Sequence, residues 1–184
     1  MSFEYAYNRL MEEEGVCLSN GEYDRGGETW AGITRKNFPK WKGWAFLDKT
    51  PPDYQMAKFW TKDFYKQWWD WIGLSRFRNA SVASSVFSYA VNAFDVQAVK
   101  DLQRAINHVS TEVKVHPYYL LKEDGILGGR TFDAANVIDD WLESNRLLRE
   151  YAARKTLFRA KCLLHDRTQI ANILGWARRD LNHV

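Results

Sequence analysis

The sequence predicts a mainly α-helical chain of 184 residues with a small loop or β-hairpin near its N-terminus. Apolar residues recur at helical spacing through most of the chain, whereas glycine, asparagine, serine and aspartate gather between residues 15 and 28. The chain has four prolines and shows no internal repeat, low-complexity segment or flexible linker. We therefore expect packed helices around one irregular segment, with any strand confined to residues 15–28.

The first helix is predicted to end at Glu14. Apolar side chains recur before it at steps of four and three, at Phe3, Tyr7 and Leu10. One further step of four reaches Glu14, which therefore shares the apolar face. The same helical wheel places Glu12 and Glu13 in solvent, so Glu14 is predicted to be the one desolvated carboxylate of the three.

A desolvated carboxyl group has a raised pKa, stays protonated near neutral pH and can act as a general acid. The alternative for Glu14 is a structural role at the helix end, because Gly15 is of a residue type common just beyond helix C-termini. The position of Glu14 leaves both roles open.

The turn-forming segment after Gly15 can fold back toward the first helix and bring Asp24 and Thr29 near Glu14. An acid together with groups that hold a water molecule is what an inverting glycosidase requires. Glu22 competes with Asp24 as the second carboxylate. Thr29 has an alternative role as the cap of a short helix predicted over residues 29–38.

Two helices of the middle region have clear start signals. Residues 41–52 are expected to form an irregular connection, after which Asp53 caps a helix that runs to about Trp71. Asn79 is the expected cap of a helix over residues 80–93. The small residues of this second helix allow close approach of its neighbours, so we expect it to be the central buried helix.

The helix before Trp71 is rich in tryptophan, and its spacing favours core packing for most of these rings. Flat aromatic rings also line sugar-binding clefts. Trp69 and Trp71 lie off the main apolar stripe, so they are predicted at the cleft or the surface, with Trp69 as a candidate substrate contact.

The C-terminal half is predicted to contain a helix over residues 98–107 and one or two helices from Asp139 to about His165. A final segment covers residues 168–181. The insert over residues 109–122 is a candidate surface lobe or partner contact.

Three segments resemble the E-G-G-Y…D-P-G-G-x-T-x-x-G-I-[ST] signature of the N-acetylmuramidases of glycoside hydrolase family 108: Glu14-Gly15, Asp24-Arg25-Gly26-Gly27-Glu28-Thr29 and Gly32-Ile33-Thr34. Some members of that bacterial and phage family are called secretion activator proteins. The resemblance implies a lysozyme-like catalytic part, with Glu14 as the acid that cleaves the β-1,4 bond between N-acetylmuramic acid and N-acetylglucosamine. Val16, Cys17 and Arg25 depart from the signature, and the spacing to Asp24 is about one residue longer.

The end of the helix over residues 80–93 is similar to a family segment that lies near the cleft and ends in asparagine. This resemblance implies that Asn92 contacts the substrate. An ordinary cap at the C-terminal end of the helix is the alternative for Asn92.

Residues 102–107 and 123–135 are similar to the L-Q-x-A-L…D-G-x-x-G-x-x-T motif of small helical peptidoglycan-binding domains. We interpret the motif as mainly structural, with an Asp-Gly turn and Thr131 as a helix cap. The chain is thus predicted to have a lysozyme-like catalytic domain over residues 1–94 and a peptidoglycan-binding-like helical domain over residues 95–184 packed on it.

The formal net charge of +3 suits an anionic polymer such as the cell wall and gives no support for nucleic-acid binding. No apolar run is long enough to span a bilayer, and the N-terminal segment lacks the features of a signal peptide. We expect synthesis in the cytoplasm, release through a holin or a secretion system, and action on the cell wall as a monomer.

Cys17 and Cys162 are the two cysteines, and both are predicted to be free thiols. The four histidines show no metal-binding spacing. No metal ion and no cofactor are expected.

The sequence leaves three functions open. The first is a muramidase with Glu14 as general acid and Asp24 or Glu22 positioning water. The second is a lytic transglycosylase, which also uses one glutamate but forms an anhydro sugar. The third is a catalytically silent cell-wall-binding or secretion accessory protein, against which the presence of Glu14, Asp24 and Thr29 argues.

Overall fold

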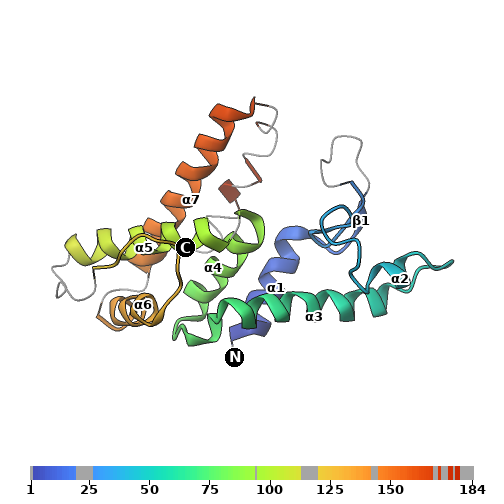
Figure 1. Ribbon diagram of the computed structural model, residues 1–184, viewed down its shortest axis with the longest axis horizontal. Coiled ribbons are helices and arrows are strands. Elements are labelled where there is room, and N and C mark those ends of the chain that lie inside the picture. The colour runs from blue at the N-terminus through green and yellow to red at the C-terminus, as the bar shows by residue number, and fades with distance from the viewer. Residues whose placement is uncertain are drawn as a thin grey trace.

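The structure is a computed structural model that describes residues 2–19, 27–93, 95–112, 120–141, 145–167, 170, 174–175 and 177–178. The described part is mainly helical with one small sheet, as predicted (Figure 1). The helices are α1 (Ser2–Glu14), α2 (Trp44–Leu47), α3 (Tyr54–Ile72), the 3₁₀ turn η1 (Leu74–Arg76), α4 (Ala80–Ala93), α5 (Asp95–Glu112), α6 (Gly129–Trp141) and α7 (Asn145–His165). The strands β1 (Leu18–Ser19), β2 (Thr29–Trp30) and β3 (Ile33–Thr34) form an antiparallel sheet in the order β1-β2-β3.

Both predicted helix caps in the middle region are confirmed. A side-chain oxygen of Asp53 accepts a hydrogen bond from the Met56 N–H at 3.1 Å at the start of α3. Asn79 Oδ1 accepts from the N–H groups of Ser81 and Val82 at the start of α4. These bonds satisfy N–H groups that have no partner within the helix.

The helix predicted over residues 29–38 is wrong, and so is the confinement of strands to residues 15–28. Residues 29–34 instead form the hairpin of β2 and β3, in which Trp30 pairs with Ile33. Its two-residue turn has φ angles of 47° at Ala31 and 79° at Gly32. Positive φ at both turn residues matches the natural twist of a two-residue hairpin. The connection predicted as irregular over residues 41–52 also contains the short helix α2.

Helix α4 is the central buried helix, as predicted. Every side chain from Val82 to Ala90 is buried. Helix α4 lies between α1 on one side and the helices α5 and α7 on the other (Figure 1). Its small residues, among them Ala83, Ser84 and Ala90, let these neighbours approach closely.

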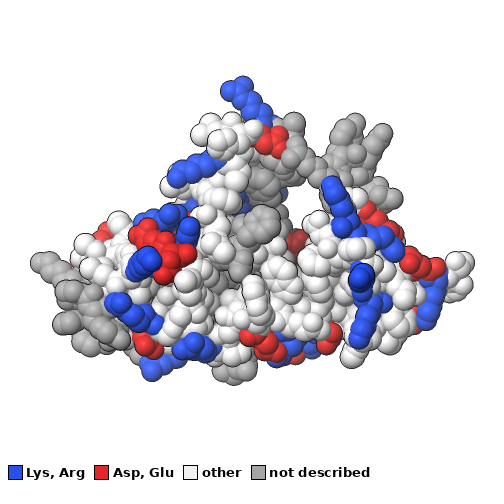
Figure 2. Space-filling model, in the orientation of Figure 1, with Lys and Arg blue, Asp and Glu red and all other residues white. Residues whose placement is uncertain are grey.

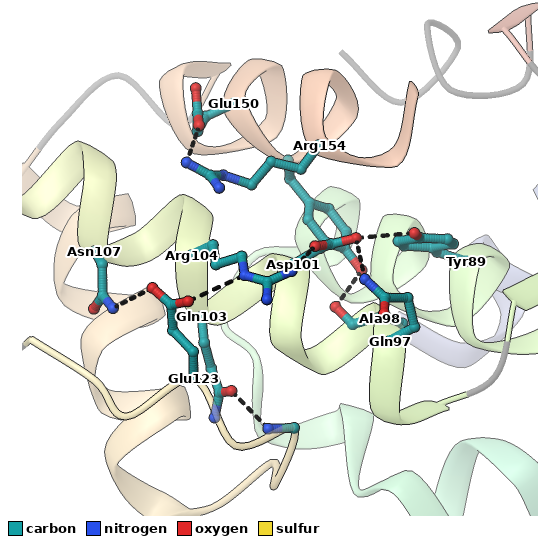
Figure 3. A network of polar contacts seen from close by, with 12 residues as sticks. Tyr89, Gln97, Ala98, Asp101, Gln103, Arg104, Asn107, Glu123, Glu150 and Arg154 are labelled. Atoms are coloured by element: carbon teal, nitrogen blue, oxygen red, sulfur yellow. Dashed lines mark hydrogen bonds and ion pairs between the residues drawn. The ribbon is translucent and has the colours of Figure 1, made fainter. Parts of the chain in front are cut away.

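A buried carboxylate joins α4 to α5. The side chain of Asp101 is 4% exposed and accepts hydrogen bonds from Tyr89 Oη, Gln97 Nε2 and Arg104 Nη1, each at 2.9 Å (Figure 3). Arg104 extends this network to Glu123 at 3.0 Å. Because each polar group of such a network finds partners, the charge can stay buried.

The Asp-Gly turn of the predicted binding motif is held by Gln103 of α5. Gln103 Oε1 accepts from the Gly125 N–H at 2.9 Å, and its amide donates to Asp124 and to the carbonyl of Ile126. These bonds agree with our interpretation of the motif as mainly structural. Thr131 is not the cap of the following helix, because α6 begins two residues earlier, at Gly129.

Candidate active site at the C-terminal end of α1

The end of α1 brings Glu14 to the meeting point of several elements. The helix ends there because Gly15 adopts a φ of 71°, and the Gly15 N–H closes the last turn on the Met11 carbonyl at 3.0 Å. Glu14 is partly buried on this last turn. Helices α3 and α4 and the β2–β3 turn all reach the same region through the contacts that follow.

Helix α4 supplies a hydrogen bond to the Glu14 carboxylate. Asn92 Nδ2 lies 3.1 Å from Glu14 Oε1 and also donates to the Ser88 carbonyl at 2.9 Å. The predicted site residues Glu14 and Asn92 are therefore brought together from positions 78 residues apart in the chain. The second bond of the amide fixes its orientation toward Glu14.

The neighbouring carboxylate is held in the same way. Ser88, one helical turn before Asn92, donates its hydroxyl to Glu13 Oε2 at 2.6 Å. Glu13 is partly buried, so our prediction that Glu14 alone would be desolvated is wrong, whereas Glu12 is exposed as expected. The reason is that α4 packs along the flank of α1 that carries Glu13, and the helical wheel of α1 alone contains no information about that neighbour.

The turn between β2 and β3 lies against the other oxygen of Glu14. A Cβ atom at Gly32 would stand 3.1 Å from Glu14 Oε2 and 2.8 Å from the Tyr65 hydroxyl. Only a glycine fits there without displacing one of these groups, and the φ of 79° favours glycine for the same position. The backbone of the turn thus forms one wall beside the carboxylate.

Two side chains of α3 hold this hairpin in place. The Tyr65 hydroxyl donates to the Ala31 carbonyl at 2.8 Å, and Trp30 Nε1 donates to the Thr61 hydroxyl at 2.9 Å. Burial, and secondarily the nearby charge of Glu14, raises the pKa of Tyr65 well above its usual value. Tyr65 therefore remains a protonated donor at neutral pH.

The other predicted site residues have different positions. Thr29 lies in β2 and donates its hydroxyl to the Gly27 carbonyl at 2.9 Å, so it caps no helix. Asp24 and Glu22 lie outside the described residues, as do Tyr118 and Tyr119 of the insert.

Trp69 is not a surface or cleft residue, which corrects its prediction as a substrate contact. Its side chain is 0% exposed and packs edge-on against the rings of Phe3 and Phe87. The buried face of α3 runs through Ala57, Thr61 and Tyr65 to Trp69 in steps of four, a stripe that the larger aromatic residues of the helix obscured. Trp71 is 71% exposed, in agreement with its predicted surface position.

Sequence reasoning missed three residues that position the Glu14 carboxylate: Gly32, Tyr65 and Ser88. The Gly-Ile-Thr sequence of residues 32–34 was considered only as part of a signature, and the Ala31-Gly32 pair is not one of the usual signals of a two-residue hairpin, because alanine rarely adopts a positive φ. Tyr65 and Ser88 carry no local signal, because their roles depend on tertiary contacts.

The surface is hollowed near this site. Figure 2 shows a notch between the small sheet on one side and the helices α4 and α7 on the other. Within the described ranges, no cluster of His, Cys, Asp and Glu suited to a metal ion is found, and no described helix has the length and apolarity needed to cross a membrane. The site thus contains a carboxyl group, Glu14, that is oriented by the Asn92 amide at one oxygen and by the turn at Gly32 at the other.

Comparisons with known proteins bear on the same region. Residues 7–93 match the family described as glycosyl hydrolase 108. The solved structure of Brucella abortus SagA is similar in fold, with a TM-score of 0.62 and 19% sequence identity over 98% of this chain and 94% of that chain. No curated protein sequence matches the chain. The matched segment contains Glu14, Gly32, Tyr65 and Asn92.

Proposed function

We propose that the chain is a glycosyl hydrolase, specifically an N-acetylmuramidase with Glu14 as its general acid, because residues 7–93 match the glycosyl hydrolase 108 family. The substrate is the glycan strand of peptidoglycan, cleaved at the β-1,4 bond between N-acetylmuramic acid and N-acetylglucosamine. This bond is implied by the family signature that surrounds Glu14 and Gly32.

One observation carries the assignment of the acid. Within the matched segment, Glu14 has one oxygen bonded by the Asn92 amide and the other against the Gly32 turn, at the point where α1, α4 and the hairpin meet. A catalytic carboxyl must be held in one geometry with respect to the scissile oxygen, because small displacements are costly in rate. Glu14 is held from two sides by groups that lie far from it in the sequence.

In the proposed reaction, the Glu14 carboxyl donates its proton to the glycosidic oxygen as the bond to the anomeric carbon breaks. The sugar on the muramic acid side develops oxocarbenium character, and a water molecule then attacks the anomeric carbon. Asp24 is the proposed residue that positions and deprotonates this water, with Glu22 as its competitor. Thr29 is proposed to assist from strand β2.

The test is hydrolysis of purified peptidoglycan by the wild-type chain and by Glu14→Gln, with mass spectrometry of the released sugar ends. Loss of a general acid is expected to lower the rate by roughly 10²–10⁴-fold. Glu12→Gln is the matched control, because it removes the same charge from an exposed position on the same helical turn. It is expected to retain wild-type activity.

The products separate the competing mechanisms. Reducing muramic acid ends from the wild type, lost in Glu14→Gln, support hydrolysis with Glu14 as acid. Anhydro ends would assign a lytic transglycosylase instead. Equal activity of the two proteins would remove Glu14 from the mechanism, and binding without any cleavage would assign a cell-wall-binding accessory protein.

We further propose that residues 95–184 form a peptidoglycan-binding-like unit that supports the catalytic part, and that the chain acts on the cell wall after release by a holin or a secretion system. The proposal for the unit depends on the Gln103-supported turn at Asp124 and Gly125. Binding of the full chain to cell-wall sacculi tests it, with Gln103→Ala, which removes the support of this turn, expected to bind more weakly than the wild type.

A further inference from the structure

A second candidate site lies on the flank of α3, outside the contacts made by Glu14. A groove of about 440 Å³ separates the segment before α2 from α3. Its walls are aromatic, and its lining includes Phe38, Trp41, Trp60 and Phe64, together with the exposed ammonium groups of Lys40 and Lys42. We call this surface the Trp41 groove.

The ring of Trp41 is fixed as a wall of this groove. Its Nε1 donates to the Trp60 carbonyl at 3.2 Å, and its ring packs edge-on against Trp44 at 5.0 Å. The indole also lies over Gly43, where a Cβ atom would stand 2.0 Å from the Trp41 ring. Because only glycine leaves room for the Trp41 ring at this point, the absence of a side chain at Gly43 allows the ring to occupy its position in the groove wall.

The Trp41 groove opens on a different face of α3 from the one that supports the active-site hairpin. Thr61 and Tyr65 contact the hairpin, whereas Trp60 and Phe64 each lie about 100° around the helix axis from them and line the groove. A ligand in the groove therefore occupies a position separate from one that contacts Glu14 beside the turn.

The chemistry of the groove fits an anionic carbohydrate. The faces of pyranose rings carry C–H groups that pack on flat aromatic rings, while a few polar groups fix the orientation of the sugar. Asn37 and Gln67 are exposed amides at the groove and can bond sugar hydroxyl and N-acetyl groups. The carboxylate at the groove, Asp63, accepts a hydrogen bond from Gln67 at 2.8 Å.

The lysines of the groove, Lys40 and Lys42, favour a negatively charged ligand. Lys42 Nζ lies 4.3 Å from the centre of the Trp60 ring, and Lys40 is exposed beside it. The buried Trp60 Nε1 has no hydrogen-bond partner in the described part of the chain. A flexible lysine covers this ring, so Lys42 can turn toward a ligand carboxylate while its stem still contacts the aromatic wall.

We propose that the Trp41 groove binds a second stretch of peptidoglycan, with the sugar rings on its aromatic walls and the carboxylates of the stem peptides on Lys40 and Lys42. The ligand class rests on the proposed function, and the position of the site rests on the groove itself. This second contact holds the chain on an insoluble glycan while Glu14 acts on a bond elsewhere.

The test measures affinity for soluble peptidoglycan fragments with stem peptides, in the Glu14→Gln background so that nothing is cleaved. The double variant Lys40→Ala with Lys42→Ala removes both ammonium groups of the groove. The matched control, Lys62→Ala with Lys66→Ala, removes the same charge from exposed positions of α3 that do not line the groove. We expect about tenfold weaker binding for the first pair, since two exposed charge-assisted contacts are together worth roughly a factor of ten, and a change below about twofold for the control.

A second variant tests the aromatic wall. Gly43→Ala keeps a helical φ of −60° but places a methyl group within the space of the Trp41 ring, so the wall must move. It is also expected to weaken binding about tenfold while the polar groups stay in place. If Gly43→Ala does not fold, the lysine pair alone decides.

Folded groove variants that bind the fragments as tightly as their parent would overturn the proposal. Equal weakening by the control pair would also overturn it, because a general charge effect would then explain the loss. The outcome is independent of the catalytic assignment: a Glu14→Gln protein that still cleaves refutes the role of Glu14, whereas binding at the groove is measured without any turnover. If the parent binds no peptidoglycan fragment, the ligand class itself is wrong.

Discussion

Replacement of Gly32 by alanine tests whether the hairpin turn positions Glu14. The added methyl group would meet the Tyr65 hydroxyl at 2.8 Å and Glu14 Oε2 at 3.1 Å. The first contact is shorter than real Cβ atoms tolerate, so the turn, the phenol or the carboxylate must shift. We expect Gly32→Ala to lose both stability and activity.

The magnitude of the effect has two parts. A non-glycine residue in the left-handed region costs about 1–2 kcal/mol. Overpacking at a tight contact adds roughly 1–3 kcal/mol. The free energy of unfolding should therefore fall by about 2–5 kcal/mol. A shift of about 1 Å at Glu14 would in addition lower the rate of peptidoglycan hydrolysis about 100-fold.

Gly73 provides a matched control. Its φ is also 79°, but an added Cβ atom would meet only ordinary contacts, with Phe132 at 3.9 Å and Arg76 at 4.0 Å. Gly73→Ala should therefore show the backbone cost of about 1–2 kcal/mol without the contact cost and without loss of activity. Urea unfolding and peptidoglycan clearing, measured on both variants, separate the two parts.

The double variant Gly32→Ala with Tyr65→Phe removes the nearest atom. We expect Tyr65→Phe to lower the free energy of unfolding less in the Gly32→Ala variant than in the wild type, because the clash with the Tyr65 hydroxyl is then removed. Equal stability losses in Gly32→Ala and Gly73→Ala, together with wild-type hydrolysis by both, would show that the turn does not constrain Glu14.

Three further predictions follow from contacts described above. Asn92→Ala removes the amide that orients Glu14 and should lower the rate of hydrolysis about tenfold with little change in the urea midpoint, whereas a wild-type rate would argue for a purely structural amide. Burial and the charge of Glu4 raise the pKa of Tyr7 to about 12, and burial also raises the pKa of Tyr65. Because the unfolded phenols ionise near pH 10, the stabilisation from Tyr7 is complete below pH 10 and is lost between about pH 10 and 12, a loss that Tyr7→Phe should reduce in unfolding curves recorded against pH. Asp101→Ala leaves the buried Tyr89 hydroxyl and Gln97 without their acceptor and should lower the free energy of unfolding by roughly 2–4 kcal/mol, and a loss below about 1 kcal/mol would show that water replaces the carboxylate.

The sequence allowed good prediction of features that depend on local chemistry. The caps Asp53 and Asn79 identified the starts of α3 and α4, because a short polar side chain before an apolar periodic segment is a local signal. The end of α1 at Glu14 was likewise predicted from the spacing of its apolar residues and the glycine that follows.

The errors concern tertiary contacts. Thr29 was expected to begin a helix, but strand pairing across a two-residue turn stabilises a hairpin at that position, together with the hydrogen bonds from Trp30 to Thr61 and from Tyr65 to Ala31. Trp69 was placed at the cleft or the surface because it lies off the stripe taken as the apolar face of α3, although it follows Tyr65 on the stripe that is buried.

Of the candidate site, the sequence identified Glu14 from its place on the apolar face of the first helix and Asn92 by resemblance to a family segment, and the structure brings these two together. The fixation of Glu13 by Ser88 was not predictable, because the helical wheel of α1 cannot reveal where α4 will pack. The roles of Asp24 and Glu22 remain predictions, since both lie outside the described residues.

The hydrogen bond between Glu14 and Asn92 also has a consequence for the order of events during synthesis. Its two partners are separated by 78 positions, and the turn beside Glu14 is fixed by Tyr65, so a nascent chain that has not yet produced α3 and α4 carries the acid without its supports. We expect ribosome-bound chains that end before Asn92 to lack the assembled site. The emergence of Asn92 from the ribosome, rather than that of Glu14, thus determines when the Glu14 carboxylate acquires its final geometry.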